Sequence, residues 1–288
     1  MVADNVFKVS AIQMVSGTSV QANLDKAAEL IAQAAAQGAR LVVLPEYFCF
    51  LGRRDPEKLA FMETPGQGPI QSFLSEAARK HGIWLLGGTL PLQSEDPDRI
   101  YNAMLVYDPQ GTQIARYDKI HLFGFRKGEE AYDESISIRP GANGPQVVET
   151  PAGRVGLSVC YDLRFPELYR AMGDVSLIVV PAAFTYTTGS AHWEILLRAR
   201  AIENQCYVLA AAQGGKHENG RRTWGHSMLI DPWGEVLQCL PEGEGVVLGD
   251  IDPARMNDIR LSLPALRHRV IGGAISTPAA RPVSENVE

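Results

Sequence analysis

Three side chains suited to nucleophilic or acid–base chemistry follow stretches of this sequence that are typical of strands. Cys160 comes directly after the run 155–159, Glu46 follows the run 41–44, and Lys119 follows the segment 112–117. A thiol at the end of a buried strand is held rigidly, and free backbone N–H groups at a following helix start can stabilise a thiolate or an oxyanion. The pattern predicts a cysteine nucleophile, with a small buried core cysteine as the alternative.

A carboxylate and a fixed cation are what such a thiol needs, because at neutral pH only a small fraction is thiolate. Glu46 can take the thiol proton as general base and return it to the departing amine. Lys119 supplies positive charge that faces the developing oxyanion, and the backbone N–H of Tyr161 is a second donor. Attack by Cys160 on an amide carbon would release ammonia and leave a thioester for water to hydrolyse. This chemistry requires no metal or organic cofactor.

Strand and helix patterns alternate along the chain and would place these three residues at strand ends. We expect strands at 6–14, 40–44, 83–90, 101–107, 112–117, 155–159, 175–180, 206–212, 227–230, 235–238 and 246–251, and helices at 24–36, 69–80, from 166 onward, 191–204 and 253–261. Turn residues at 108–111 and 231–234 predict hairpins. The stretch 124–144 is expected to be a long irregular loop, which in a compact domain is usually functional. The alternation predicts layered α/β packing in one domain with two similar halves.

Composition excludes several classes of protein. The net charge of −6, from 27 Lys+Arg against 33 Asp+Glu, argues against a nucleic-acid-binding face. No apolar run approaches the roughly 20 residues of a membrane span, and the N-terminal residues lack the order of a secretory signal. Cys49, Cys160, Cys206 and Cys239 are scattered without a C-x-x-C pair, which argues against a zinc site or a disulfide framework. We therefore expect a cytoplasmic protein with neither nucleic-acid nor membrane partners.

The three motifs together resemble the Glu, Lys and Cys signatures of the nitrilase superfamily of carbon–nitrogen hydrolases. They are residues 45–46, 117–122 and 159–167, in that family's order and at its separations. The resemblance covers residues 6–270 and implies a four-layer αββα sandwich, followed by a C-terminal tail at 271–288. It also implies Glu46, Lys119 and Cys160 as the catalytic set, with no cofactor. A further glutamate is implied between Lys119 and Cys160, and Glu134 matches that position.

Residue types after the cysteine resemble the amidase branch, because true nitrilases carry Trp-Glu there. A longer match from 184 to 234 is similar to the amidases that act on deaminated glutathione and to the neighbouring ω-amidases of 2-oxoglutaramate and 2-oxosuccinamate. Nitrilase and N-carbamoyl amidohydrolase activities are lower alternatives. The resemblance implies four substrate contacts, at Tyr161, Arg164, Phe184 and Thr188. Such substrates carry a carboxylate, and its candidate partners are Arg164, Arg198 and Arg200, although the last two can equally form a salt-bridged helix face.

Two other interpretations use the same residues differently. A Cys–His hydrolase could draw on one of the six histidines, among which His121 lies nearest to Lys119 in sequence. A binding protein with a dead site would be expected to lack one of the three catalytic residues, and all are present. For assembly, the resemblance implies a homodimer or a higher homo-oligomer. We expect the apolar segments 261–266 and 270–273 to cover the partner subunit.

Overall fold

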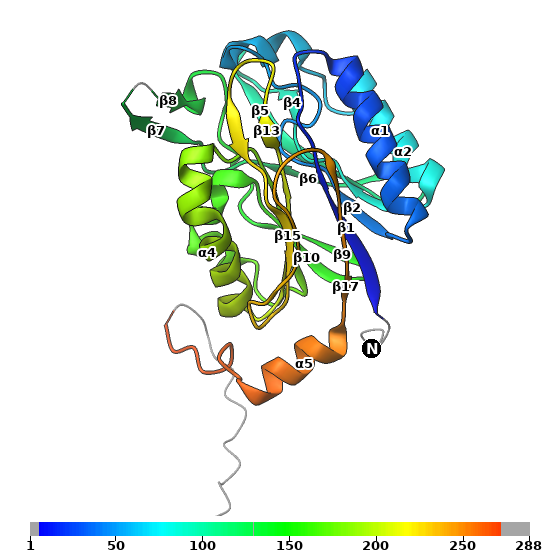
Figure 1. Ribbon diagram of the computed structural model, residues 1–288, viewed down its shortest axis with the longest axis vertical. Helices are drawn as coiled ribbons and strands as arrows, with labels where there is room; N and C mark the ends of the chain where they lie inside the picture. Colours follow the sequence, from blue (N-terminus) through cyan, green and yellow to red (C-terminus); the bar gives the residue numbers. More distant parts are fainter. Residues whose placement is uncertain (1–5, 129, 272–288) are drawn as a thin grey trace, which may run out of the picture.

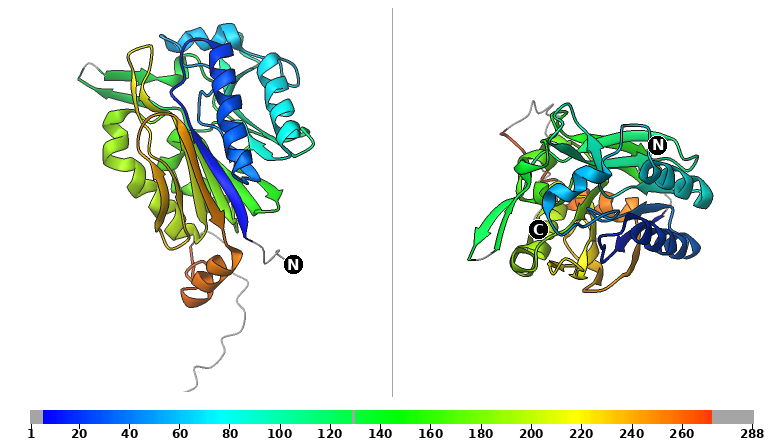
Figure 2. Two further views of the ribbon diagram at one scale, coloured as in Figure 1. Left: turned by 45° about the vertical axis from the view of Figure 1, so that its right-hand side comes forward. Right: turned by 90° about the horizontal axis from the view of Figure 1, so that it is seen from above.

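Two β-sheets pack face to face between two layers of helices in the computed structural model, which describes residues 6–128 and 130–271 (Figure 1). The first sheet has the strand order β17-β1-β2-β3-β5-β4, with β6 paired to β5, and the second has the order β16-β15-β12-β11-β10-β9. Helices α1 and α2 cover the outer face of the first sheet, and α4 lies on the opposite side of the molecule (Figure 2). The expected αββα sandwich is confirmed.

The strands and helices have the following bounds. The first sheet consists of β1 (Phe7–Gln13), β2 (Leu41–Val43), β3 (Trp84–Leu86), β4 (Leu90–Gln93), β5 (Ile100–Tyr107), β6 (Gln113–Asp118) and β17 (Gly245–Ile251). The second consists of β9 (Gln146–Thr150), β10 (Gly153–Leu157), β11 (Leu177–Ala182), β12 (Tyr207–Ala212), β15 (Ser227–Ile230) and β16 (Val236–Leu240). Two small hairpins are β7 (Gly124–Lys127) with β8 (Glu130–Asp133), and β13 (Gly214–Lys216) with β14 (Arg222–Trp224). The helices are α1 (Val20–Ala36), α2 (Pro69–His81), α3 (Pro166–Ala171), α4 (Tyr186–Asn204) and α5 (Pro253–Ser262), with 3₁₀ turns η1 (Asp55–Phe61), η2 (Glu134–Ile136) and η3 (Cys160–Arg164).

Each half of the molecule is built on three parallel strands, β1-β2-β3 and β10-β11-β12. Alternate residues of a strand face opposite sides, so Leu41 and Val43 of β2 enter the core between the sheets while Val42 packs under α1 and α2. Antiparallel strands continue both sheets, and β17 returns to pair with β1 in the register Phe7↔Ile251. Because the carboxyl ends of parallel strands share one edge of a sheet, residues just beyond β2 and β10 can meet there.

Several expected elements are corrected by the structure. The predicted strand 83–90 is broken into β3 and β4 by Gly87 and Gly88, the second of which has φ +53°. The prediction of an irregular loop over 124–144 is wrong in its first half, where β7 and β8 form a hairpin. Helix α4 begins five residues before the predicted start, because the Thr185 hydroxyl caps it by accepting from the backbone N–H of Thr188 at 3.3 Å.

Helix α5 is docked on its own chain. Met256 and Ile259 are buried, and Arg260 donates hydrogen bonds to the carbonyls of Gln205 and Val175 at 2.9 and 2.7 Å. Beyond the helix, the Leu263 carbonyl accepts from the Gln205 amide at 2.6 Å, but the side chains of Leu261 and Leu263 are exposed, so the expectation that the segment 261–266 covers a partner subunit stays a prediction. From residue 272 on, the expected tail lies outside the described residues. Within the described ranges, no helix is long and apolar enough to cross a membrane.

Candidate active site

Cys160 lies in a tight turn between the end of β10 and α3. Its φ of +50° is in the left-handed region. A residue with a side chain is strained there by about 1–3 kcal/mol, and contacts with the surrounding structure must offset that strain. The carboxylate of Asp162 helps to hold this conformation, because it accepts a hydrogen bond from the backbone N–H of Val159 at 2.9 Å. The thiol is thus presented from a rigid turn at a strand end, as the sequence predicts.

Glu46 occupies a second such turn, just after β2. The next residue, Tyr47, has φ +57°, and its backbone N–H donates to the hydroxyl of Thr89 at 2.9 Å. Gly88 allows this close packing, because a Cβ there would lie 2.1 Å from the Pro45 carbonyl oxygen. The Glu46 carboxylate is 1% exposed, and its Oε2 accepts the Ala183 backbone N–H at 3.0 Å.

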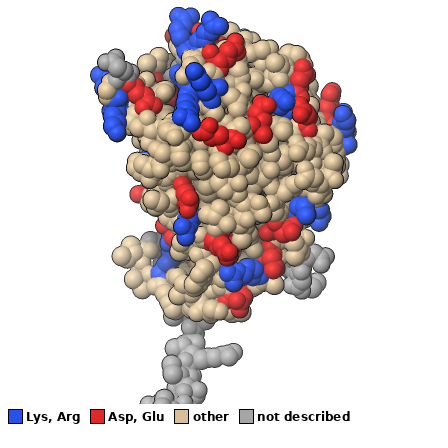
Figure 3. Space-filling model, viewed as in Figure 1, with Lys and Arg blue, Asp and Glu red and all other residues tan. Residues whose placement is uncertain are grey.

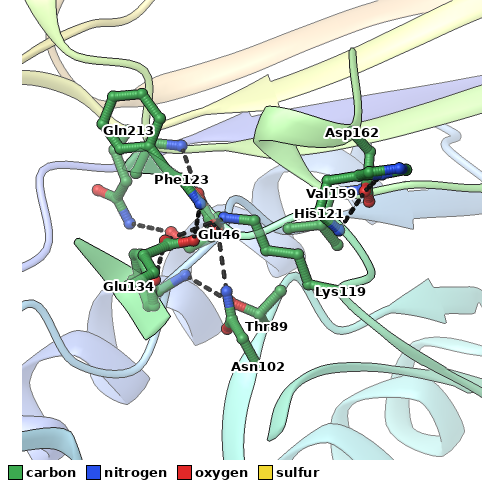
Figure 4. A network of polar contacts seen from close by, with 12 residues as sticks. Glu46, Thr89, Asn102, Lys119, His121, Phe123, Glu134, Val159, Asp162 and Gln213 are labelled. Carbon is green, nitrogen blue, oxygen red and sulfur yellow. Dashed lines mark hydrogen bonds and ion pairs between the residues drawn. The ribbon is translucent and has the colours of Figure 1, made fainter. Parts of the chain in front are cut away.

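Lys119 joins the two candidate carboxylates. Its Nζ donates to Glu46 Oε1 at 2.9 Å and to both carboxylate oxygens of Glu134, at 3.0 and 2.8 Å (Figure 4). The lysine side chain is 0% exposed. A buried ammonium with two carboxylate partners keeps its charge and its position, which is what a fixed electrostatic stabiliser requires.

Glu134 is held by Phe123 and Tyr47 as well as by Lys119. Its Oε2 accepts the backbone N–H of Phe123 at 2.7 Å, and its Oε1 accepts the hydroxyl of Tyr47 at 2.7 Å. Burial opposes the charged form of Glu134, but the charges of Lys119 and Lys58 outweigh it, so the pKa of Glu134 lies below its ordinary value. This carboxylate therefore stays ionised and contacts the Tyr47 side chain as well as the lysine.

Burial and charge set the protonation of the other groups. Desolvation raises the pKa of Glu46, an effect that Lys119 only partly offsets, and desolvation together with the Glu46 charge raises the pKa of the Cys160 thiol well above its ordinary value. Burial disfavours the charged form of Lys119, yet Glu134 and Glu46 raise its pKa well above the usual range. Cys160 is therefore a thiol at rest, within hydrogen-bonding reach of a carboxylate of elevated basicity.

Asn102 is a site residue that the sequence interpretation missed. Its side-chain amide donates to Glu46 Oε1 at 2.9 Å, and its backbone carbonyl accepts the N–H of Lys119 at 3.1 Å. Asn102 is 1% exposed and is the third residue of the apolar strand β5. A polar residue inside an apolar strand is the signal that could have identified it.

Asp162, also missed, ties the cysteine turn to the segment that carries Lys119. Besides Val159, it accepts the hydroxyl of Tyr117 at 2.7 Å and the backbone N–H of His121 at 3.1 Å, and the His121 ring Nδ1 lies 2.7 Å from Oδ1. The His121 ring stacks on Phe165 with centroids 3.7 Å apart. His121 therefore supports the turn, and among the described residues that line the pockets beside Cys160 there is no histidine.

Two adjoining pockets open beside Cys160. One is lined by the predicted substrate contacts Tyr161, Arg164, Phe184 and Thr188, together with shared residues at Cys160. The other is lined by Glu46 and Glu134, by Tyr132 of the hairpin β7–β8, and by further residues, namely Arg221, Arg222, Thr223, Tyr47 and Leu51. All four predicted contact residues thus lie at the site. In the described chain, no group of three His, Cys, Asp or Glu residues is placed to hold a metal ion.

Arg198 and Arg200 line neither of these pockets. Arg198 donates to the Gly234 carbonyl at 2.8 Å and faces Glu194. Arg200 donates to the Leu163 carbonyl at 2.8 Å and pairs with Glu203 at 2.8 Å, so it stabilises η3 from outside the pockets. Of the three candidate cations named from the sequence, only Arg164 lines a pocket at Cys160.

Comparisons with known proteins agree with this geometry. The profile of the carbon-nitrogen hydrolase family matches residues 8–261. A protein of Synechocystis sp. named deaminated glutathione amidase is 42% identical over 269 residues, which are 92% of this chain and 98% of that protein. The crystal structure of the C. elegans NitFhit protein superposes with a TM-score of 0.84 at 38% identity, covering 93% of this chain and 66% of that chain. An amidase from Nesterenkonia sp., solved with acrylamide added at its active-site cysteine, gives a TM-score of 0.73 at 30% identity over 90% of this chain and 98% of that one.

Proposed function

The chain belongs to the carbon–nitrogen hydrolase family, and from that premise we propose that it hydrolyses the amide bond of a small carboxylated substrate through a thioester on Cys160. The observation that carries the proposal is the buried Glu46–Lys119–Glu134 cluster, with its 2.9 and 2.8 Å ion pairs, set beside a cysteine in a left-handed turn. A core cysteine would need none of these partners.

Formation of the thioester begins from the neutral thiol. As Sγ attacks the amide carbon, the thiol proton passes to Glu46, whose pKa burial raises above its ordinary value, so that it is a stronger base than a solvated carboxylate. The carbonyl oxygen becomes an oxyanion that faces Lys119 Nζ and the backbone N–H of Tyr161. Donors that are fixed before the reaction stabilise such an intermediate without reorganising.

Collapse of the intermediate breaks the C–N bond. Glu46 gives the proton that it took from the thiol to the leaving nitrogen, and an amine departs. Water then attacks the thioester while Glu46 accepts one of its protons, and that proton returns to Sγ as the acid is released. Throughout the cycle Glu134 keeps Lys119 oriented toward Glu46, which is a positioning role.

We propose deaminated glutathione as the substrate, because the relatives at 42% identity carry that name. The ω-amides 2-oxoglutaramate and 2-oxosuccinamate are the second candidates, since the Arg164 pocket suits the carboxylate that all three compounds share. The leaving groups differ: a primary ω-amide releases ammonia, whereas deaminated glutathione, a substituted amide, releases a peptide amine.

The test is a comparison of kcat/KM on deaminated glutathione, 2-oxoglutaramate, an aliphatic nitrile and an N-carbamoyl amino acid, with Cys160→Ala as the blank for each compound. We expect the highest value on deaminated glutathione and measurable turnover of 2-oxoglutaramate. A preference for the nitrile or the carbamoyl compound would contradict the proposed amidase activity.

We also propose a homodimer in the cytoplasm. Ile195 and Ile202 on α4 are 70% and 49% exposed, and Leu261 near the end of α5 is 71% exposed. Apolar side chains gathered in this way are typical of a subunit interface, which agrees with the family resemblance. All four cysteines are free, which is typical of a protein in a reducing compartment such as the cytoplasm.

A further inference from the structure

The general base and the nucleophile come from different sheets, so their alignment depends on contacts between the sheets. Glu46 follows β2 of the first sheet, and Cys160 follows β10 of the second. We propose that Gln213, directly after β12, is a positioning residue that fixes the backbone turn at Glu46 to the sheet that carries Cys160. This inference rests on the proposed amidase function and extends it to a residue that lines neither pocket beside the nucleophile.

The side-chain amide of Gln213 is hydrogen-bonded at both ends within the interior. Gln213 is 0% exposed, and its Nε2 donates to the backbone carbonyl of Glu46 at 3.0 Å (Figure 4). Nε2 also donates to the Ser16 hydroxyl at 2.8 Å, and Oε1 accepts the Ser16 backbone N–H at 3.0 Å. Because that N–H can only donate and the Glu46 carbonyl can only accept, the amide has one orientation, with its NH₂ group toward Glu46.

One peptide group is held from both sheets. The carbonyl of Glu46 and the N–H of Tyr47 belong to the same planar group. Its carbonyl accepts from Gln213, and its N–H donates to the hydroxyl of Thr89, just before β4, at 2.9 Å. Tyr47 has φ +57°, a conformation that persists only where contacts enforce it. Gln213 therefore opposes a rotation of this peptide that would relieve the strain at Tyr47 and displace Glu46.

The second sheet holds the Glu46 side chain as well. Ala183 follows β11, and its backbone N–H donates to Glu46 Oε2 at 3.0 Å. Gln213 is attached to the same strand end, because its own N–H donates to the Ala182 carbonyl at 2.8 Å. Strand β11 lies between β12 and β10, and β10 leads to Cys160. Contacts at one edge of the second sheet thus align the base with the nucleophile.

A neutral amide suits position 213, and a carboxylate does not. Asp and Glu side chains in Figure 3 lie on the surface, where water solvates their charge. A carboxylate at 213 would be buried with one oxygen facing the Glu46 carbonyl, close to the Glu46 carboxylate, so it would bind a proton more readily than a solvated acid does. His217, whose Nδ1 lies 2.9 Å from the Ser16 carbonyl oxygen, supplies no compensating charge at neutral pH, because burial lowers its pKa. Once protonated, the introduced acid regains a donor for Glu46.

Two replacements of Gln213 and a matched control test the inference. Gln213→Leu removes the donor at similar volume, Gln213→Glu removes it only while the new side chain is ionised, and Gln71→Leu is the control. Gln71 is 5% exposed, and its amide accepts from the Gly66 N–H and donates to the Thr64 carbonyl, at 2.8 and 2.9 Å, away from the two pockets. The kcat and KM are measured on deaminated glutathione and 2-oxoglutaramate, and thermal unfolding verifies that each variant is folded.

We expect Gln213→Leu to lower kcat by about 10–10²-fold, the scale on which a displaced catalytic group slows a reaction, with KM little changed. Gln71→Leu should lose thermal stability alone. For Gln213→Glu, the kcat relative to the unchanged chain should rise as the pH falls, because protonation restores the hydrogen-bond donor. Gln213→Leu has no titratable group at this position and should show no such rise.

Alkylation of Cys160 by iodoacetamide is a second measurement, which needs no amide substrate. Burial and the charges of Glu46 and Glu134 raise the pKa of the thiol, whereas Lys119 lowers it. With Glu46 displaced, the thiol should ionise more readily. Alkylation of Gln213→Leu should therefore begin at lower pH than alkylation of the unchanged chain or of Gln71→Leu.

Two results would overturn the inference while leaving the amidase function intact. One is a folded Gln213→Leu protein with the kcat of Gln71→Leu, and the other is a Gln213→Glu protein whose relative kcat does not rise as the pH falls. Failure of the unchanged chain to hydrolyse either amide would instead contradict the proposed function. In that case the alkylation profile decides, and identical profiles for Gln213→Leu and the unchanged chain would exclude the positioning role.

Discussion

The side-chain amide of Asn102 donates a 2.9 Å hydrogen bond to Glu46 Oε1, the same carboxylate oxygen that accepts from Lys119 Nζ. Through its backbone carbonyl, Asn102 also holds the N–H of Lys119. One residue of β5 therefore fixes the general base relative to the cation. It also stabilises the ionised form of a carboxylate whose pKa burial raises above the ordinary value of 4.5.

Replacing Asn102 by Leu should change the pH dependence of the reaction. The base works only when ionised, so kcat/KM falls as the pH falls through the pKa of Glu46. Without the amide donor that pKa rises further, and the acidic limb of the profile moves to higher pH. A loss of about 1.5–3 kcal/mol in the free energy of unfolding should accompany it. The measurement is kcat/KM against pH.

Asn204→Leu is the matched control. Asn204 is 4% exposed and donates to the Arg200 carbonyl at 2.9 Å, away from the catalytic cluster. It should lower stability without moving the acidic limb. Superimposable pH profiles for the unchanged chain and Asn102→Leu would show that Asn102 does not tune the base.

Lys119→Met keeps the side-chain stem and removes its charge. We expect kcat to fall by about 10²–10³-fold, the cost of losing one oxyanion donor. The variant also leaves two buried carboxylates without their cation, which costs about 3–5 kcal/mol of stability at neutral pH. Lys26→Met, which removes a surface lysine paired with Glu29, should resemble the unchanged chain.

The stability lost in Lys119→Met should itself depend on pH. In the unchanged chain the pKa of Glu134 is below its ordinary value of 4.5, so this group stabilises the fold above that pH and less as the pH falls through its lowered pKa. In the variant both carboxylates protonate more readily. Denaturant unfolding should therefore show the difference between the two proteins narrowing as the pH falls, and a constant difference would contradict this account.

Asp162→Asn tests the hydrogen bonds that hold the turn containing Cys160. The carboxylate accepts hydrogen bonds from Val159, Tyr117 and His121, and an amide can satisfy only some of these donors. The free energy of unfolding should fall by about 1.5–3 kcal/mol, and kcat should fall because the cysteine turn loosens. Asp250→Asn, at a 50% exposed carboxylate, should change the unfolding free energy by less than about 0.5 kcal/mol.

His121→Ala, measured in the same assays, distinguishes a structural role of His121 from a role as general base. Its ring contacts Asp162 and Phe165 rather than the pockets at Cys160, so its loss should reduce kcat far less than Glu46→Gln does. An equal loss in folded proteins would favour the Cys–His mechanism instead.

Much of the site could be predicted because Glu46 and Cys160 each follow an apolar strand, Lys119 follows a hairpin strand, and all three lie within recognisable motifs. Asn102 and Asp162 could not, because their partners are 56 and 41 residues away and only the packed sheets bring them together. The β7–β8 hairpin was missed for a different reason. Its strands are mostly exposed and polar, and the cross-strand pair Phe125↔Tyr132 is visible only once the register is known.

The proposed homodimer can be tested by introducing a charged side chain on α4. Ile195→Glu places a carboxylate at a 70% exposed apolar position, which a subunit interface would have to desolvate. Light scattering should show a dimer for the unchanged chain and a monomer for the variant. Ile114→Glu, at a 41% exposed position on β6, should stay dimeric. A dimeric Ile195→Glu protein would place the interface elsewhere.

The covalent role of Cys160 can be measured directly by mass spectrometry. The protein is mixed with deaminated glutathione, quenched in acid within the first turnovers, and its peptides are mapped. The proposed mechanism predicts an acyl group of the substrate's oxo-acid half on the peptide that contains Cys160, absent in Cys160→Ala, while Cys206→Ala retains both adduct and turnover. Full turnover by Cys160→Ala, or an acyl group on any other residue, would contradict the mechanism.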